Sequence, residues 1–202
     1  MIEKEVYILL TNTGSLLTKL IKLYTKKPYN HASIAFDHNL SEVYSFGRKT
    51  ARNPFIGGFV KEDVREGLFK QADCALYSIT VTESQIQKMK YYLQEIETQK
   101  KHYRYNFLGL FGVMFNKPLK RNNAFFCSQF VAFILKESTI IQFQKPISLI
   151  APYDFQCVPN VHLVYEGKLK NYQNENIAEK HCIPLSEIGV FSNRLKWLSS
   201  FV

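Results

Sequence analysis

The chain has 202 residues, of which 46% are hydrophobic and 14% aromatic, and its formal net charge is +9. This composition excludes a disordered chain, and the length predicts a single domain, residues 1–202, with a sizeable core. No apolar run is long enough to span a membrane, and residues 1–5 are too polar for a signal peptide, so we expect a cytoplasmic protein.

The first predicted elements are a strand and a helix. Residues 6–10 form a short run of strand-forming apolar residues, which predicts a buried strand. Residues 17–24 then place apolar side chains at helical intervals with lysines between them, and Pro28 ends this helix.

Two β-prone runs, residues 29–36 and 42–47, flank a short polar turn and predict an antiparallel hairpin. If the turn is centred on His38, His31 pairs with Ser45 on one face of the sheet, and Ser33 pairs with Val43. A register slip of one residue would separate His31 from Ser45.

The middle of the chain predicts a loop, a strand and a helix. Residues 48–70 contain a proline and the pair Gly57-Gly58, and we expect a long loop there. Residues 74–81 alternate as a strand does, and Thr82 to Gln85 matches a capping box at a helix start. The helix that follows has an apolar stripe formed by Ile86, Met89, Leu93 and Ile96.

A second helix is predicted around Cys127, since apolar side chains recur there at helical spacing, with Asn122 or Asn123 as the N-cap. Unpaired N–H groups and the helix dipole favour a thiolate in the first turn of a helix. Cys127 is therefore a candidate nucleophile if a base lies nearby, and otherwise a small buried hydrophobic residue.

Four further segments complete the chain. Residues 103–112 are aromatic, apolar and flexible at their glycines, and residues 151–155 form a turn that starts a short helix. Residues 161–165 predict another strand, and residues 194–202 a short amphipathic helix.

The cysteines are widely spaced and contain no Cys-x-x-Cys pair, so we expect reduced thiols rather than disulfides: Cys74, Cys127, Cys157 and Cys182. A zinc site can be drawn from Cys157, His162, His181 and Cys182. The last two of these residues are adjacent, and the spacing fits no familiar zinc-binding pattern. We therefore expect neither a metal nor another cofactor.

Among the histidines, only His31 begins a predicted inward-facing strand, which makes it the candidate base for Cys127. The order of the pieces resembles the circularly permuted members of the NlpC/P60 and papain-like superfamily, in which the histidine strand precedes the cysteine helix. The resembling segments are residues 29–34, the tyrosine segment 103–107, the nucleophile helix 126–131 and the Pro-x-Asp turn 151–155.

The resemblance implies an α+β, permuted papain-like fold, with an antiparallel sheet packed on the nucleophile helix. It also implies Cys127 as the nucleophile and His31 as the base. The residue that orients the imidazole corresponds to Ser45, where related members often carry a carboxylate, so Glu42 is an alternative. A tyrosine that donates to the oxyanion, or simply packs as an aromatic residue, corresponds to Tyr103 or Tyr105.

These features predict a thiol hydrolase (an amidase or peptidase) or an acyltransferase that acts on a small-molecule, peptide or lipid acyl substrate. The positive charge leaves a second interpretation open, a non-catalytic protein that binds an anionic membrane surface or nucleic acid. Nucleic acid is disfavoured, since the sequence contains no recognised binding module. A purely structural or metal-held domain would leave the order of His31 and Cys127 as coincidence.

Overall fold

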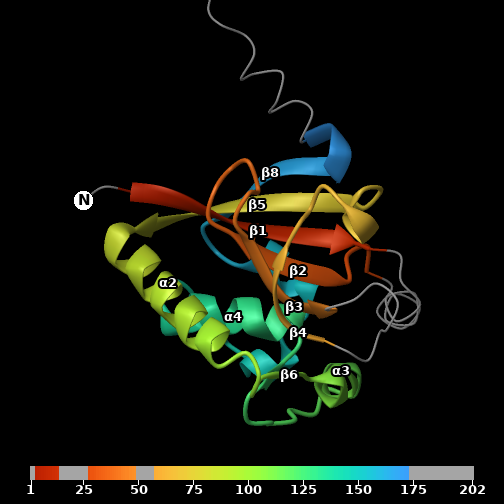
Figure 1. Cartoon of the computed structure of the whole chain (residues 1–202), viewed down its shortest axis with the longest axis vertical. Coiled ribbons are helices and arrows are strands. Elements are labelled where there is room, and N and C mark those ends of the chain that lie inside the picture. Colours follow the sequence, from red (N-terminus) through yellow and green to blue (C-terminus); the bar gives the residue numbers. More distant parts are fainter. Residues whose placement is uncertain (1–2, 14–26, 49–56, 173–202) are drawn as a thin grey trace, which may run out of the picture.

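A six-stranded antiparallel sheet forms the centre of the structure, a computed structural model that describes residues 3–13, 27–48 and 57–172. The fold is therefore α+β, as predicted, and the strand order is β4-β3-β2-β1-β5-β8 (Figure 1). The strands are β1 (Glu3–Asn12), β2 (His31–Ala35), β3 (Val43–Arg48), β4 (Gly57–Glu62), β5 (Asp73–Thr82) and β8 (Val161–Lys168). The helices predicted at 17–24 and 194–202 lie outside the described residues.

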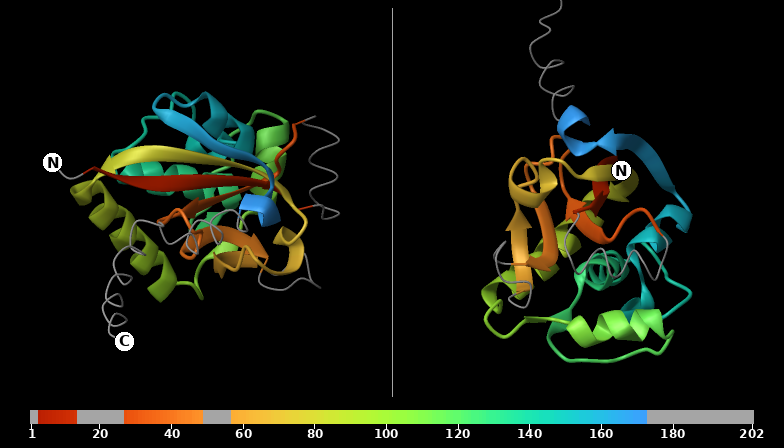
Figure 2. Two further views of the ribbon diagram at one scale, coloured as in Figure 1. Left: turned by 90° about the horizontal axis from the view of Figure 1, so that it is seen from above. Right: turned by 90° about the vertical axis from the view of Figure 1, so that its right-hand side faces the viewer.

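Helices α3 and α4 lie below the sheet in Figure 1 and in the right-hand view of Figure 2, and α4 packs directly on β2 and β3. The α-helices are α2 (Glu83–Thr98), α3 (Phe107–Met114) and α4 (Cys127–Glu137). The chain also contains the short 3-10 helices η1 (Gly67–Phe69), η2 (Ile147–Leu149) and η3 (Pro152–Cys157). Strands β6 (Arg104–Tyr105) and β7 (Ala124–Phe125) form a small parallel pair. None of the helices in the described part of the chain has the length and hydropathy of a membrane span.

The central strand β1 is buried on both faces, which explains the unbroken apolar run in its sequence. Side chains alternate along a strand, so Ile8 and Leu10 face the helices, whereas Tyr7 and Leu9 join a second cluster on the opposite face. The strands predicted at 6–10, 74–81 and 161–165 are all confirmed as parts of this sheet.

The early hairpin is confirmed, but its predicted register is wrong by two residues. Ala35 pairs with Val43, where the prediction paired Ser33 with Val43. The turn is centred one residue later than expected, because the Asp37 carboxylate accepts backbone N–H groups from across the turn. Extending the observed register puts Ser33, not His31, opposite Ser45.

The long loop expected at 48–70 is wrong for residues 57–62, which form β4 and pair with β3, and residues 49–56 lie outside the described residues. Gly57 does not mark a flexible turn; it lies where the backbone of β4 comes close to Tyr105 and Gly47. A Cβ atom at Gly57 would lie 2.9 Å from the Cβ of Tyr105 and 3.0 Å from the carbonyl oxygen of Gly47. The glycine is required by packing within a strand.

Helix α2 has the predicted start and buried face. The Thr82 hydroxyl accepts the backbone N–H of Gln85, and the Gln85 side chain accepts the backbone N–H of Thr82. The predicted stripe of Ile86, Met89, Leu93 and Ile96 is buried.

Helix α4 begins later than predicted. Its N-cap is Phe126, which provides no side-chain cap, so neither Asn122 nor Asn123 has the predicted role. The reason is that Ala124–Phe125 is extended and pairs with β6, which delays the helix until Cys127. The segment expected to be flexible at its glycines contains α3, where the Asn106 side chain accepts the backbone N–H of Gly109 at 3.0 Å.

Candidate active site

Cys127 is the first residue of α4, and polar contacts hold this end of the helix in place. The Ser128 hydroxyl donates to the carbonyl of Ile150 at 2.7 Å, and the Gln129 side chain accepts from Asn106 at 3.2 Å. Cys127 itself is 3% exposed. Its sulfur therefore has a fixed position at a helix start, as the sequence predicted.

The sulfur of Cys127 is hydrogen-bonded to the imidazole of His31, the first residue of β2. The backbone N–H groups of Ala32 and Ser128 are also directed at this sulfur. Burial alone would raise the pKa of the thiol, but these three donors outweigh burial, and the pKa of Cys127 lies below its ordinary value of 9.0. The structure thus brings the predicted nucleophile and base together.

A carboxylate holds the other side of the imidazole. Oε1 of Glu62, the last residue of β4, lies 2.8 Å from Nε2 of His31, which leaves Nδ1 for Cys127. The second carboxylate oxygen accepts from the Ser33 hydroxyl at 2.5 Å. Burial opposes charge on the ring, but Glu62 and Cys127 together outweigh it and raise the pKa of His31 to about 10. These contacts favour a thiolate–imidazolium pair.

Gly47 and Phe69 border the contact between His31 and Glu62. A Cβ atom at Gly47 would lie 3.2 Å from Oε1 of Glu62 and 3.7 Å from Cε1 of His31, so a larger residue there would intrude. The Phe69 ring lies 6.0 Å from the His31 ring, between centroids. The side chains of His31 and Glu62 are only 13% and 7% exposed, so their attraction is weakly screened by water.

Ser45 does not orient His31 in this structure. Its buried hydroxyl donates to the carbonyl of Ala32 at 2.8 Å and so supports the backbone next to the histidine. The alternative, Glu42, is exposed. Glu62 was missed because Gly57-Gly58 suggested a loop, although Phe59 and Val60, directly before Lys61 and Glu62, are strand formers that could have indicated β4.

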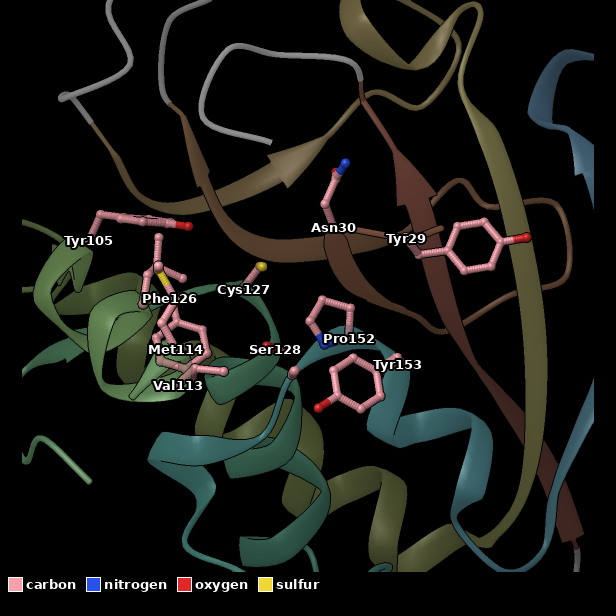
Figure 3. Close-up of a pocket in the computed structure, with 12 residues that line it drawn as sticks. Tyr29, Asn30, Tyr105, Val113, Met114, Phe126, Cys127, Ser128, Pro152 and Tyr153 are labelled. Atoms are coloured by element: carbon pink, nitrogen blue, oxygen red, sulfur yellow. The ribbon is translucent and has the colours of Figure 1, made fainter. Parts of the chain in front are cut away.

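The two candidate tyrosines have different surroundings in the structure. Tyr105 lines a pocket together with Cys127 (Figure 3). Tyr103 instead stacks on Phe125, with ring centroids 5.9 Å apart, and meets Phe46 edge-on. Tyr103 is thus a packing residue, and only Tyr105 is placed beside the nucleophile.

The pocket at Cys127 has a volume of about 520 Å³, part of it open to solvent, and its walls are mostly apolar. Leu110, Val113 and Met114 of α3 form one wall, and Pro152 and Tyr153 of η3 form another (Figure 3). Asn30 also lines the pocket, whereas the hydroxyl of its neighbour Tyr29 points away and donates to Glu166 at 2.6 Å.

The Pro-x-Asp turn fixes the η3 wall. The Asp154 carboxylate accepts the backbone N–H of Ala151 at 2.6 Å, and Lys145 lies 2.6 Å from the same carboxylate oxygen. Asp154 thereby caps η3 and positions its neighbours Pro152 and Tyr153 in the pocket.

Within residues 3–13, 27–48 and 57–172, no three His, Cys, Asp or Glu side chains are grouped so that they could hold a metal. Of the zinc set drawn from the sequence, Cys157 and His162 are exposed, and His181 and Cys182 lie outside the described residues. Cys74 is a buried thiol whose pKa is raised to about 12 by burial and nearby carboxylates.

Comparisons of the chain with protein-family models, with curated proteins and with solved structures found no match. The site itself is therefore the basis for assigning a function.

Proposed function

We propose that the protein is a cysteine-dependent hydrolase or acyltransferase that acts on an amide, peptide or ester. The observation that carries this proposal is the series of contacts from Glu62 through His31 to Cys127. A nucleophile, a base and a group that orients the base are the parts that thiol catalysis needs. The order of the histidine strand and the cysteine helix, which resembles the permuted NlpC/P60 arrangement, supports a permuted papain-like fold.

In the proposed reaction, the Cys127 thiolate attacks the carbonyl carbon of the substrate and forms a tetrahedral oxyanion. When this intermediate collapses, the bond to the amine or alcohol breaks, and His31 gives its proton to that leaving group. The acyl group is then a thioester on Cys127. Water, or an acceptor alcohol or amine, attacks the thioester and gives a proton to His31, which restores the ion pair.

The oxyanion needs hydrogen-bond donors close to Cys127. Backbone N–H groups at the start of α4 can serve, because the first N–H groups of a helix have no partner within it. Tyr105 lines the same pocket and is the side chain that we assign as a further donor. The apolar walls suit a substrate with an acyl chain or an apolar side chain next to the scissile carbonyl.

Alkylation by iodoacetamide, followed for each cysteine by mass spectrometry, tests the activated thiolate. At slightly acidic pH we expect Cys127 to react faster than the exposed thiol of Cys157, and Cys74 to be protected. The His31→Ala variant should react at least about tenfold more slowly at Cys127, because the donor that favours the thiolate is lost. His102→Ala, which changes an exposed histidine, is the matched control.

An activated acyl ester tests the covalent step. Incubation with a p-nitrophenyl ester should add one acyl group to Cys127, and Cys127→Ala should not be acylated at this position. If iodoacetamide alkylates Cys127 no faster in the folded protein than in urea, the ion pair does not activate the thiol and the proposal is wrong.

A further inference from the structure

The outward face of α3 carries large apolar side chains that are exposed. Leu108, Phe111 and Phe115 follow one another at helical spacing and are 55%, 53% and 64% exposed, and Leu119 is 40% exposed. Leu119 belongs to the same patch, because its Cγ would lie 3.3 Å from a Cβ atom at Gly112. Single exposed apolar residues are ordinary, but a contiguous group of this kind marks an interaction surface.

Packing inside the protein does not explain these residues. The opposite face of α3 provides Leu110, Val113 and Met114 to the pocket at Cys127, so the helix is apolar all round. A helix of that composition is normally buried on all sides. Here one face serves the pocket, and the other is presented to the surroundings.

The sequence that contains α3 carries charge of a single sign. Residues 98–136 contain no aspartate or glutamate, and their basic residues are Lys100, Lys101, Arg104, Lys117, Lys120, Arg121 and Lys136. Lys117, Lys120 and Arg121 lie within the six residues after the exposed Phe115 and are themselves exposed. A surface with apolar residues beside several cations complements an anionic lipid headgroup layer above hydrocarbon.

We propose that this face, defined as Leu108, Phe111, Phe115 and Leu119 with Lys117, Lys120 and Arg121, docks on an anionic lipid bilayer. We call it the α3 face. The apolar side chains enter the boundary between headgroups and acyl chains, and the cations bind the headgroups. A second copy of the chain fits less well, since two such basic surfaces would repel each other. Nucleic acid fits less well too, because Phe111 and Phe115 could stack on bases but Leu108 and Leu119, half of the apolar side chains of this face, could not.

Docking would bring the pocket next to the bilayer, because α3 is both a wall of the pocket and the centre of the α3 face (Figure 3). The inference goes beyond the proposed function and does not depend on Cys127. Cys127→Ala should bind vesicles as the wild type does, so failure of catalysis and failure of docking can be told apart.

Vesicle co-sedimentation of the full chain tests the α3 face. We expect binding to equimolar phosphatidylserine and phosphatidylcholine vesicles, weaker binding to phosphatidylcholine alone, and weaker binding at high salt. Phe111→Ser should weaken binding about tenfold or more, since it removes an aromatic side chain that would leave water for the bilayer on docking. Lys117→Glu with Lys120→Glu should weaken binding to the anionic vesicles by about thirtyfold or more.

Matched controls change exposed residues of the same kinds elsewhere. Leu163→Ser on β8 removes an apolar side chain that is 53% exposed, and Lys88→Glu with Lys90→Glu on α2 changes the net charge by the same amount. These controls should bind vesicles almost as the wild type does. Circular dichroism and thermal unfolding confirm that each variant is folded.

Four results would overturn the proposal. The first is a wild-type protein that binds neither vesicle, and the second is a loss of binding in the controls as large as in the test variants. The third is a dimer in light scattering that Phe111→Ser dissociates, which would make the α3 face a contact between copies. The fourth is binding to single-stranded nucleic acid that the same variants abolish, with no binding to vesicles.

Discussion

The Glu62 carboxylate lies 2.8 Å from the His31 imidazole although β3 separates their two strands in the sheet. The approach is close to Gly47 of that intervening strand, where a Cβ atom would lie 3.2 Å from Oε1 of Glu62. Ser33 holds the second carboxylate oxygen. The orientation of the base therefore depends on three neighbouring strands rather than on a single hairpin.

Glu62→Gln and Ser45→Ala should have different effects. The first removes the negative charge that favours imidazolium, so alkylation of Cys127 at slightly acidic pH should slow about ten- to a hundredfold. The second removes a buried hydrogen bond to the carbonyl of Ala32, and should lower the free energy of unfolding by about 1 kcal/mol with little change in alkylation. Urea unfolding and alkylation rates measure both. Equal slowing in the two variants would contradict the assignment of Glu62.

Gly47→Ala and Gly47→Val should give graded losses. The Cβ atom of alanine would displace the Glu62 carboxylate by only a few tenths of an ångström, whereas valine adds methyl groups where Glu62 and His31 meet. Alkylation of Cys127 should slow slightly in the first variant and approach the rate of Glu62→Gln in the second.

The matched control is Gly47→Val combined with Glu62→Gln. If valine acts by disturbing the carboxylate, the double variant should be no slower than Glu62→Gln alone. Additive losses would mean that valine damages the site in another way.

His31 should remain protonated far above the ordinary pH range of histidine. Its pKa is raised from 6.5 to about 10, because Glu62 and Cys127 outweigh the effect of burial, so the ring loses its proton only as the pH rises through about 10. Ring resonances in an NMR titration, assigned with a His31→Gln variant, measure this. Glu62→Gln should lower the midpoint. A wild-type midpoint near 6.5 would mean that the site holds a neutral thiol and a neutral imidazole.

Tyr105→Phe should slow turnover of an ester substrate about a hundredfold, because one donor to the oxyanion is lost, while alkylation of Cys127 keeps its rate. Alkylation forms no oxyanion and so serves as the internal control. Tyr103→Phe is the matched variant, since its ring packs on Phe125 away from the pocket, and it should keep its turnover. A similar loss in both variants would show that Tyr105 acts only through packing.

The sequence by itself determined the features that depend on neighbouring residues. The strand within β1, the capping box of α2 and the Asp154 turn follow from side-chain period and from hydrogen bonds between residues a few positions apart. The position of Cys127 at a helix start is of the same kind. These patterns remain readable because a helix or strand imposes its period locally.

Only the tertiary structure decided which groups meet at the site. The turn at Asp37 set a register different from the predicted one, and this gave Ser45 a backbone partner instead of His31. The contact of Glu62 with His31 requires β4, a strand whose two glycines instead predict a loop. Tyr103 and Tyr105 are two residues apart, yet only Tyr105 reaches the pocket. Such contacts depend on the pairing of distant strands, whose register is set by turn geometry and close packing, and local sequence patterns do not determine these.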